Sequence, residues 1–446
     1  MKTKLLSLAL TLTTLTAAHA EGLTNFVSFT VETKIKGPFT VISNELYFAA
    51  EKGGSLNYGY IGKFNPASNT LSALYEFPGE TKVKDGFTVV SDELWFVCEK
   101  GGANNFGYLG SFHLASNTAT RLHDFATDIK PKTAPLALDT NGWYFFADKA
   151  GSSGVGALLR YSPVGGVSTA ASFTLATGVK VESRPVWFNG QLYYAAREGG
   201  DTTQLAGKGA GAIGTIDLTT GTVTKLADLD ATNNVAKIKT LLPFNGRLYY
   251  TGEEGGDLSL NSGKGFGGLG YYEPTNNTFT RLLVCDSSTT GTKPRGLVPV
   301  GDRLYFNCGE GGPNGYGTFG VVSNGTTVAI IAVNDLAVGS KSDAGITRFG
   351  NYIFFVTELG GATFLGRISA YELPSAGSAA PLLTIEVVGN SLQLSWPESA
   401  SDFVLEQSAS LTGDWLVIAG PGATSVSVPM TNSGGISPWP IPDGNS

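Results

Sequence analysis

The sequence predicts an all-β protein: a seven-bladed β-propeller of four-stranded antiparallel blades, followed at the C-terminus by a small β-sandwich that lacks a closing strand. Three observations carry this prediction. A unit of about 50 residues recurs seven times, each copy holds four short apolar runs separated by turn residues, and the last copy lacks a strand that the N-terminus can supply. The 60 glycines, which follow no collagen period, fit a chain with many turns.

An apolar residue followed by two aromatic residues marks each copy. Successive copies are 48, 49, 49, 56, 56 and 49 residues apart, and the triplets are Leu46-Tyr47-Phe48, Leu94-Trp95-Phe96, Trp143-Tyr144-Phe145, Leu192-Tyr193-Tyr194, Leu248-Tyr249-Tyr250, Leu304-Tyr305-Phe306 and Ile353-Phe354-Phe355. In the first copy we expect strands at Phe39–Ile42, Leu46–Ala50, Tyr60–Phe64 and Leu71–Phe77. Four such strands form one blade, and stacking blades around an axis buries both faces of each sheet. A solenoid is the alternative, but meander blades without helices favour the ring.

The two ends of the array predict a closed ring. The seventh copy has three strands, ends at Tyr371-Glu372-Leu373 and then meets Pro374. At the other end of the chain, Val27–Lys36 (VSFTVETKIK) aligns with Leu74–Lys84 (LYEFPGETKVK), which is the end of the first copy's fourth strand and the loop after it. We therefore expect the mature N-terminus to complete the last blade, which also removes exposed sheet edges.

Residues 1–20 resemble a secretory signal peptide. Lys2 and Lys4 precede an apolar run from Leu5 to Leu15, and Ala18-His19-Ala20 fits a cleavage site. The run is too short for the alternative, a membrane anchor, and no other stretch is expected to span a bilayer. We expect a protein of the periplasm, the cell surface or the medium. Losing both lysines takes the net charge from −7 to −9, which disfavours nucleic acid as a partner.

The C-terminal part of the chain predicts a second, smaller module after the propeller of residues 21–373. Residues 374–381 (PSAGSAAP) have the composition of a linker. Strands are expected from Leu382, Ser391, Phe403, Trp415 and Ser425, in the manner of a fibronectin-type or immunoglobulin-like module over residues 382–430. The Gly/Pro-rich tail, 431–446, is predicted to be disordered and offers no closing strand.

The repeat unit resembles the GloVer-type tandem repeat of exported bacterial proteins. The residues that carry this resemblance are Leu304-Tyr305-Phe306, Gly311-Gly312 and Gly315-Tyr316-Gly317, and the same layout recurs at Gly53-Gly54 with Tyr58-Gly59. The resemblance covers residues 22–374. It implies a surface or secreted location and no defined activity.

The usual catalytic and cofactor signatures do not occur in this sequence. The mature chain has two histidines, His113 and His123, which lie ten residues apart in the second copy and fit either a metal pair or two surface imidazoles. The sequence contains three cysteines, Cys98, Cys285 and Cys308. Cys98 and Cys308 share a repeat position in distant copies, so we expect buried thiols rather than a disulfide framework. No cofactor is expected, with Ca²⁺ as the open alternative.

One polar feature recurs three residues after the second aromatic of each triplet, at Glu51, Glu99, Asp148, Arg197, Glu253, Gly309 and Glu358. Five of these seven residues are acidic, which predicts a ring of carboxylates near one mouth of the channel. Such a ring could bind a cation or a hydroxyl-rich ligand, or it could simply solvate the rim. The basic residues Arg184, Lys239 and Arg295, at the entries to first strands, are expected to face the same mouth.

The fourth and fifth copies have longer glycine-rich loops, which begin near Asp201 and Asp257. These paired insertions fit either a ridge that contacts a partner or a tolerated duplication. Together, these features favour a monomeric, exported, non-catalytic protein that binds a carbohydrate or protein ligand. The alternative is a carbohydrate hydrolase or lyase, which needs two carboxylates within about 10 Å of each other at the channel mouth.

Overall fold

The computed structural model describes residues 22–374 and five short segments, 384–388, 391–396, 405–407, 416–419 and 424–429. The predicted signal peptide therefore lies outside the described residues, as do the tail and most of the linker. The described chain is all-β, as predicted, with two short 3₁₀ turns, η1 (Leu205–Gly207) and η2 (Asn261–Gly263). Within these residues there is no helix with the length and hydropathy needed to cross a bilayer.

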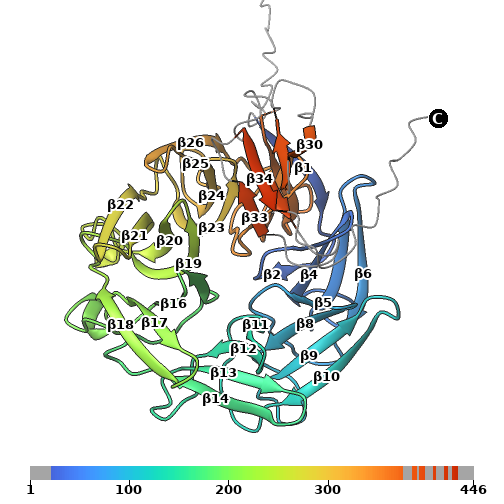
Figure 1. Ribbon diagram of the computed structural model, residues 1–446. Helices are drawn as coiled ribbons and strands as arrows, with labels where there is room; N and C mark the ends of the chain where they lie inside the picture. The colour runs from blue at the N-terminus through green and yellow to red at the C-terminus, as the bar shows by residue number, and fades with distance from the viewer. Residues whose placement is uncertain are drawn as a thin grey trace, which may run out of the picture. The chain divides into compact units, whose positions relative to one another are not determined.

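Seven antiparallel sheets form the ring of the propeller, and each blade runs from the channel outwards (Figure 1). Blade one has an innermost strand in two pieces, β2 (Lys34–Ile35) and β3 (Thr40–Ile42), followed by β4 (Glu45–Lys52), β5 (Tyr60–Asn65) and β6 (Thr70–Glu76). Blade two contains β7 (Thr88–Val90), β8 (Glu93–Cys98), β9 (Tyr108–His113) and β10 (Thr118–Asp124). Blade three contains β11 (Leu136–Asp139), β12 (Gly142–Ala147), β13 (Ala157–Ser162) and β14 (Gly166–Ser172).

The remaining blades follow the same order. Blade four contains β15 (Val186–Phe188), β16 (Gln191–Ala196), β17 (Ala212–Asp217) and β18 (Thr222–Asp228). Blade five contains β19 (Ala236–Phe244), β20 (Arg247–Glu254), β21 (Gly268–Glu273) and β22 (Thr278–Val284). Blade six contains β23 (Thr292–Val300), β24 (Arg303–Glu310), β25 (Thr318–Ser323) and β26 (Thr327–Val333). Blade seven contains β27 (Ile346–Phe349), β28 (Tyr352–Thr357), β29 (Arg367–Glu372) and, from the N-terminus, β1 (Leu23–Ser28).

The N-terminal strand β1 is the outermost strand of the last blade. It pairs antiparallel with β29, with Leu23 opposite Tyr371 and Asn25 opposite Ser369. The predicted segment, Val27–Lys36, is shifted: only its first two residues belong to β1, and Lys34–Ile35 pairs with β4 of blade one instead. The reason is that the aligned region also contained the loop that carries the chain from the last blade to the first.

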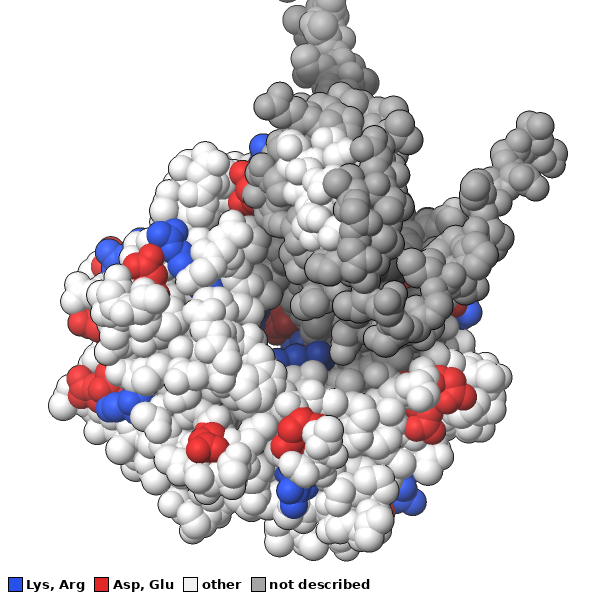
Figure 2. Space-filling view, in the orientation of Figure 1, with Lys and Arg blue, Asp and Glu red and all other residues white. Residues whose placement is uncertain are grey.

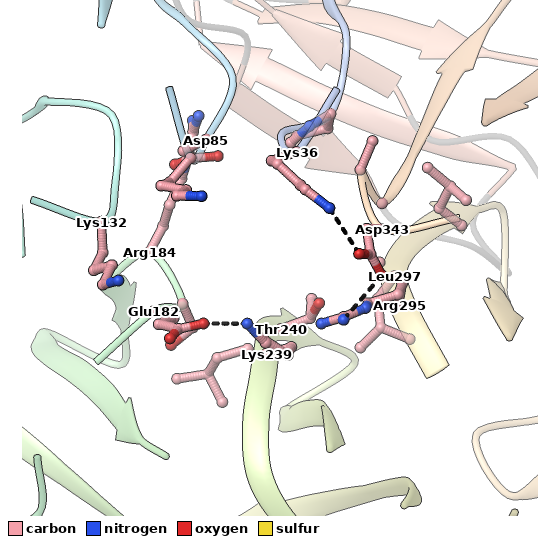
Figure 3. Close-up of a pocket in the computed structure, with 18 residues that line it drawn as sticks. Lys36, Asp85, Lys132, Glu182, Arg184, Lys239, Thr240, Arg295, Leu297 and Asp343 are labelled. Carbon is pink, nitrogen blue, oxygen red and sulfur yellow. Dashed lines mark hydrogen bonds and ion pairs between the residues drawn. The ribbon is translucent and has the colours of Figure 1, made fainter. Parts of the chain in front are cut away.

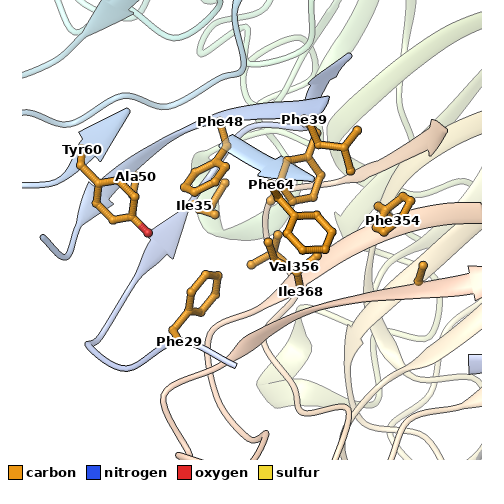
Figure 4. Close-up of a cluster of buried hydrophobic side chains, with 13 residues drawn as sticks. Phe29, Ile35, Phe39, Phe48, Ala50, Tyr60, Phe64, Phe354, Val356 and Ile368 are labelled. Carbon is orange, nitrogen blue, oxygen red and sulfur yellow. The ribbon is translucent and has the colours of Figure 1, made fainter. Parts of the chain in front are cut away.

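A cluster of buried apolar side chains fills the junction between the last and the first blade (Figure 4). Phe29, which follows β1, is 1% exposed and packs in this cluster with Phe48 and Ala50 of blade one and Val356 and Ile368 of blade seven. Burial of aromatic side chains of this size typically contributes ~2–3 kcal/mol each, so the junction is a main source of ring stability.

The same arrangement recurs at the other junctions. The residue after each fourth strand donates its backbone N–H to the carbonyl oxygen of the glycine before the third strand of its own blade, at 2.9–3.1 Å; these residues are Phe29, Phe77, Phe125, Phe173, Leu229, Cys285 and Asn334. In four of the seven, Phe29 among them, the side chain packs in an apolar cluster with a small residue of the next blade's second strand. Phe77 shares a cluster with Cys98, Phe125 with Ala147 and Phe173 with Ala196. We call these seven residues the junction residues.

Beyond the propeller, the described segments form two small sheets. β30 (Thr384–Val388), β31 (Ser391–Ser395) and β34 (Ser425–Pro429) make one antiparallel sheet, and β32 (Leu405–Gln407) pairs with β33 (Leu416–Ala419). Each of these strands overlaps a segment in which the sequence predicts a strand. The fibronectin-type or immunoglobulin-like module remains a prediction.

Candidate functional site

A cavity of about 470 Å³ lies on the propeller axis. Its lining comes from the start of the innermost strand, or from the segment just before that strand, in all seven blades, an arrangement that only the mouth of the channel can provide. Figure 2 shows basic and acidic side chains together in the hollow at the centre of the ring. Six basic and three acidic side chains line the cavity: Lys36, Lys84, Lys132, Arg184, Lys239, Arg295, Asp85, Glu182 and Asp343.

A short repeated motif positions most of these groups. Every blade enters its innermost strand through lysine, a spacer residue and a second charged residue, which is Lys36, Lys84, Lys132, Glu182, Lys239, Arg295 or Asp343 in blades one to seven. Successive side chains of an extended chain point to opposite faces. The spacer, such as Ile35 or Val83, is buried between blades at 1% exposure, and the charged residue that follows lines the cavity.

The five predicted carboxylates lie just behind this lining, and each forms an ion pair with a basic side chain. Lys84 Nζ lies 2.5 Å from Glu51 Oε2 of the preceding blade, and Lys132 Nζ lies 2.5 Å from Glu99 Oε1. The same pairing links Lys36 with Glu358 and Arg295 with Glu253, while Asp148 pairs with Lys132 of its own blade. The carboxylates and their basic partners therefore form a belt of ion pairs around the mouth, in which the carboxylates supply the negative charges. We call it the channel-mouth ion-pair belt.

Blade four reverses the charges of the belt. Glu182 occupies the position that is basic in most other blades, and Arg197 occupies the acidic position. Arg197 pairs with Glu182, at 2.6 Å, and with Glu253 of blade five, and Lys239 also pairs with Glu182. Burial would raise the pKa of Glu182, but Lys239 and Arg197 outweigh burial and hold this pKa at about 2.

The reversal leaves one carboxylate poorly compensated, at the junction of blades three and four. The other four carboxylates each pair with a basic residue of the next blade, whereas the next blade presents Glu182 to Asp148. Burial raises the pKa of Asp148 to about 6; Lys132, at 3.2 Å, opposes this rise and the charge of Glu182 adds to it. Among the described residues, Asp148 Oδ1 is buried without a hydrogen-bond partner. Two neighbouring carboxyl groups thus have pKa values shifted in opposite directions.

Two bridges cross the mouth between blades (Figure 3). Asp343 of blade seven binds Lys36 of blade one at 2.9 Å and Arg295 of blade six at 3.1 Å. Arg184 of blade four reaches Asp85 of blade two, with Nε–Oδ2 at 2.8 Å. With 34% of its side chain exposed, Arg184 is the most accessible cation among the ion pairs of this cavity.

The structure places two predicted residues away from the channel. Asp201 and Asp257 begin the long loops that contain η1 and η2, and their carboxylates accept hydrogen bonds from Thr203 and Ser259 of the same loops. These bonds lower the pKa of both aspartates.

The two histidines are also apart from the mouth and from each other. His113 pairs with Asp92 at 2.7 Å, whereas the ring of His123 packs against Phe125 and Tyr161. In the part of the chain that the structure describes, no three His, Cys, Asp or Glu side chains are grouped to hold a metal ion.

Sequence reasoning named Lys239 and Arg295 but missed Lys36, Lys84 and Lys132 of the belt, together with Glu182, Asp343 and Asp85. A signal for most of them was present, because a lysine two residues before each belt residue recurs in all seven copies: Lys34, Lys82, Lys130, Lys180, Lys237, Lys293 and Lys341. The bridge from Arg184 to Asp85 had no such signal, since it joins copies 99 residues apart.

The fold and the site define this chain as a seven-bladed β-propeller with a charged channel mouth. No protein-family model matches the sequence, and no curated protein does either, so the resemblance to the GloVer-type repeat stays a prediction. Among solved structures, an oligogalacturonate lyase in complex with manganese is similar with a TM-score of 0.52 at 11% identity, covering 77% of this chain and 90% of that one. An oligogalacturonate lyase from Vibrio parahaemolyticus gives 0.53 at 10% identity, covering 80% and 94%. At such identities the likeness shows the fold alone.

Proposed function

We propose that this protein is an exported, non-catalytic binding propeller whose channel mouth holds a small acidic, hydroxyl-rich ligand, such as a sugar acid. One observation carries the proposal: six basic and three acidic side chains from all seven blades converge on a cavity of about 470 Å³. This volume is in the range of small-molecule sites. Lysine and arginine donors suit a ligand carboxylate, and the aspartates and glutamate suit ligand hydroxyl groups.

The belt supports binding more than catalysis. The carboxylates that reach the cavity are held in ion pairs, and the pKa values of Glu182 and Asp343 are lowered to about 2 despite burial, by Lys239 and Arg197 and by Arg295 and Lys36 respectively. Such groups stay ionised at neutral pH and cannot act as general acids. Because their partners fix them before any ligand arrives, the cavity is preorganised, which lowers the entropic cost of binding.

The second candidate is a carbohydrate hydrolase or lyase. It is favoured by Asp148 and Glu182, since two neighbouring carboxyls with separated pKa values are typical of acid/base pairs. Two structural neighbours are oligogalacturonate lyases, one of them with manganese. Asp148 itself is buried behind Lys132 and does not line the cavity, which is why we place this candidate second.

The test is a binding screen with a parallel turnover assay on the mature chain. An array of neutral and uronic-acid-containing oligosaccharides gives the strongest acidic probe, which is then titrated by calorimetry against wild type, Arg184→Ala and the control Arg121→Ala. Arg121 is an exposed arginine on β10, away from the channel. Loss of one charge-assisted contact should weaken binding by about tenfold or more in Arg184→Ala and leave Arg121→Ala unchanged.

Each result separates the two candidates. Acidic oligosaccharides that bind and are recovered intact support the binding propeller. New reducing ends or unsaturated products, abolished by Asp148→Asn, would support the enzyme instead. Equal loss in both arginine variants, or no preference for acidic sugars, contradicts the proposed site. Calcium titration of the same protein tests the Ca²⁺ alternative for the carboxylates.

A further inference from the structure

Two of the three cysteines meet where blade five joins blade six. Cys285 is the junction residue that follows β22, and Cys308 lies in β24. Both are free thiols in the structure and both are buried, at 1% and 0% exposure. The Cys308 thiol, together with burial, raises the pKa of the Cys285 thiol, which fits two neighbouring thiols at this junction. The third cysteine, Cys98, donates its thiol to the carbonyl oxygen of Tyr108 at 3.4 Å, within its own blade.

The repeat shows how unusual this pair is. In four of the other junctions, a phenylalanine is opposed by a small residue in a shared apolar cluster: Phe29 by Ala50, Phe77 by Cys98, Phe125 by Ala147 and Phe173 by Ala196. Cys98 occupies the same repeat position as Cys308. At the junction of blades five and six, both positions are cysteine. The backbone is the same as elsewhere, because Cys285 donates its N–H to Gly267 at 2.9 Å as the other junction residues do to their glycines.

Packing alone does not account for the pair. Replacing a buried phenylalanine by a much smaller side chain removes apolar volume and typically costs several kcal/mol unless neighbours fill the space. Cys308 restores part of this volume. The two changes together place a sulfur atom at each side of one junction, which is the arrangement that a covalent link requires.

We propose that Cys285 and Cys308 form a disulfide bond that joins blade five to blade six covalently, while Cys98 remains a free thiol. The proposal rests on the proposed export, because disulfides form and persist in oxidising compartments. It does not depend on the ligand of the channel mouth.

The bond has to form while the chain folds, since both sulfurs are closed off in the finished propeller. The thiolate of one cysteine attacks a disulfide of a donor, such as an oxidoreductase or oxidised glutathione, and releases one donor thiol. The thiolate of the other cysteine then attacks this mixed disulfide and releases the second donor thiol. The two cysteines lose two electrons and two protons in all, and the donor is reduced to two thiols.

Oxidative refolding tests the pairing without reference to export. The mature chain is reduced, unfolded and refolded with reduced and oxidised glutathione, then alkylated in denaturant and weighed intact. We expect one alkylated thiol per chain out of the three cysteines, and a non-reduced peptide map in which the Cys285 peptide is joined to the Cys308 peptide. Matched variants give different counts: Cys98→Ser should leave no thiol, whereas Cys285→Ser and Cys308→Ser should each leave two.

Three alkylated thiols in the refolded wild type, or a map that joins Cys98 to another cysteine, would overturn the proposal. A second arm applies the same assay to protein that is expressed with residues 1–20 and recovered outside the cytoplasm. The link in this material supports the disulfide in the exported protein, and three free thiols there contradict it. Recovery of the chain in the cytoplasm alone would refute export, while the refolding arm still decides whether the two cysteines pair.

Discussion

Asp148→Asn is expected to stabilise the propeller at neutral pH and to leave it unchanged near pH 4. Burial, with the help of the Glu182 charge, raises the pKa of Asp148 from its ordinary value of 3.8 to about 6. The folded protein therefore keeps this proton to higher pH than the unfolded chain does. The contribution to stability is fully present below about pH 4 and is lost as the pH rises through about 6.

The magnitude follows from the interval between the two pKa values. At ~1.4 kcal/mol per pH unit, the interval from 3.8 to about 6 amounts to ~3 kcal/mol. Ionised Asp148 thus costs the folded state about this much at neutral pH, in spite of its ion pair with Lys132. Asparagine has nearly the same shape without the charge, so the variant should gain up to ~3 kcal/mol at pH 8.

Glu182→Gln is the matched comparison, because Glu182 lies beside Asp148 and its pKa is shifted the other way. The pKa of Glu182 is lowered from 4.5 to about 2, so ionised Glu182 stabilises the fold above about pH 4.5, and this stability is lost as the pH falls toward 2. The variant should lose ~3 kcal/mol at neutral pH. It should also lower the pKa of Asp148, since one neighbouring negative charge is gone.

Urea unfolding of the wild type and both variants, at several values between about pH 4 and about pH 8, measures these differences. The two variants should have opposite signs at neutral pH and converge toward the acid end. If Asp148→Asn were destabilising by more than ~1 kcal/mol at pH 8, the reasoning would be refuted, because Asp148 would then be a well-compensated member of the belt. Equal effects at pH 4 and pH 8 would also contradict it.

Three further predictions concern the framework of the ring. Phe29→Ala should lower the free energy of unfolding by ~3–5 kcal/mol in urea titrations, because it empties the junction that the N-terminal strand closes. Reduction of a Cys285–Cys308 disulfide, whose loop has about 24 residues, should cost ~3 kcal/mol, seen as a lower Tm in calorimetry; an equal Tm with and without reductant would contradict this. Gly59→Ala should lower the free energy of unfolding more than Gly190→Ala, for which we expect ~1 kcal/mol. Both glycines have positive φ, but a Cβ at Gly59 would lie 2.1 Å from a carbonyl oxygen, whereas Gly190 has open space around it.

The architecture could be predicted from sequence because each blade uses the same residues for the same physical task. The aromatic triplets recur since every second strand must fill the space between two blades, as the full burial of Phe48 and Phe96 shows. The closing strand was predicted in kind but misplaced, because an alignment to the first copy could not separate the strand from the loop after it. The bounds Leu23–Ser28 are set by pairing with β29, which is adjacent in space but lies at the other end of the propeller sequence.

Only part of the candidate site could be predicted from the repeat. Counting along the repeat found the carboxylates, since position alone defines them. It did not find that Lys84 covers Glu51 or that Lys132 covers Glu99, because those contacts join neighbouring blades and depend on how the blades stack. For Asp201, the sequence showed only its place in a long loop; the structure adds that its carboxylate accepts hydrogen bonds from Thr203 of the same loop, and a partner contact of this loop stays a prediction.

The position of β1 in the last blade has a consequence for how the molecule is made. Among the strands of the ring, β1 is synthesised first, but its partner β29 is synthesised last. Until then, β1 and the edge of the incomplete ring both present unpaired backbone groups, and the contact between them joins the two ends of the propeller sequence, which is typical of a slow final step. A chain that ended before β29 would leave β1 without a partner, and its unpaired sheet edges would be prone to aggregate.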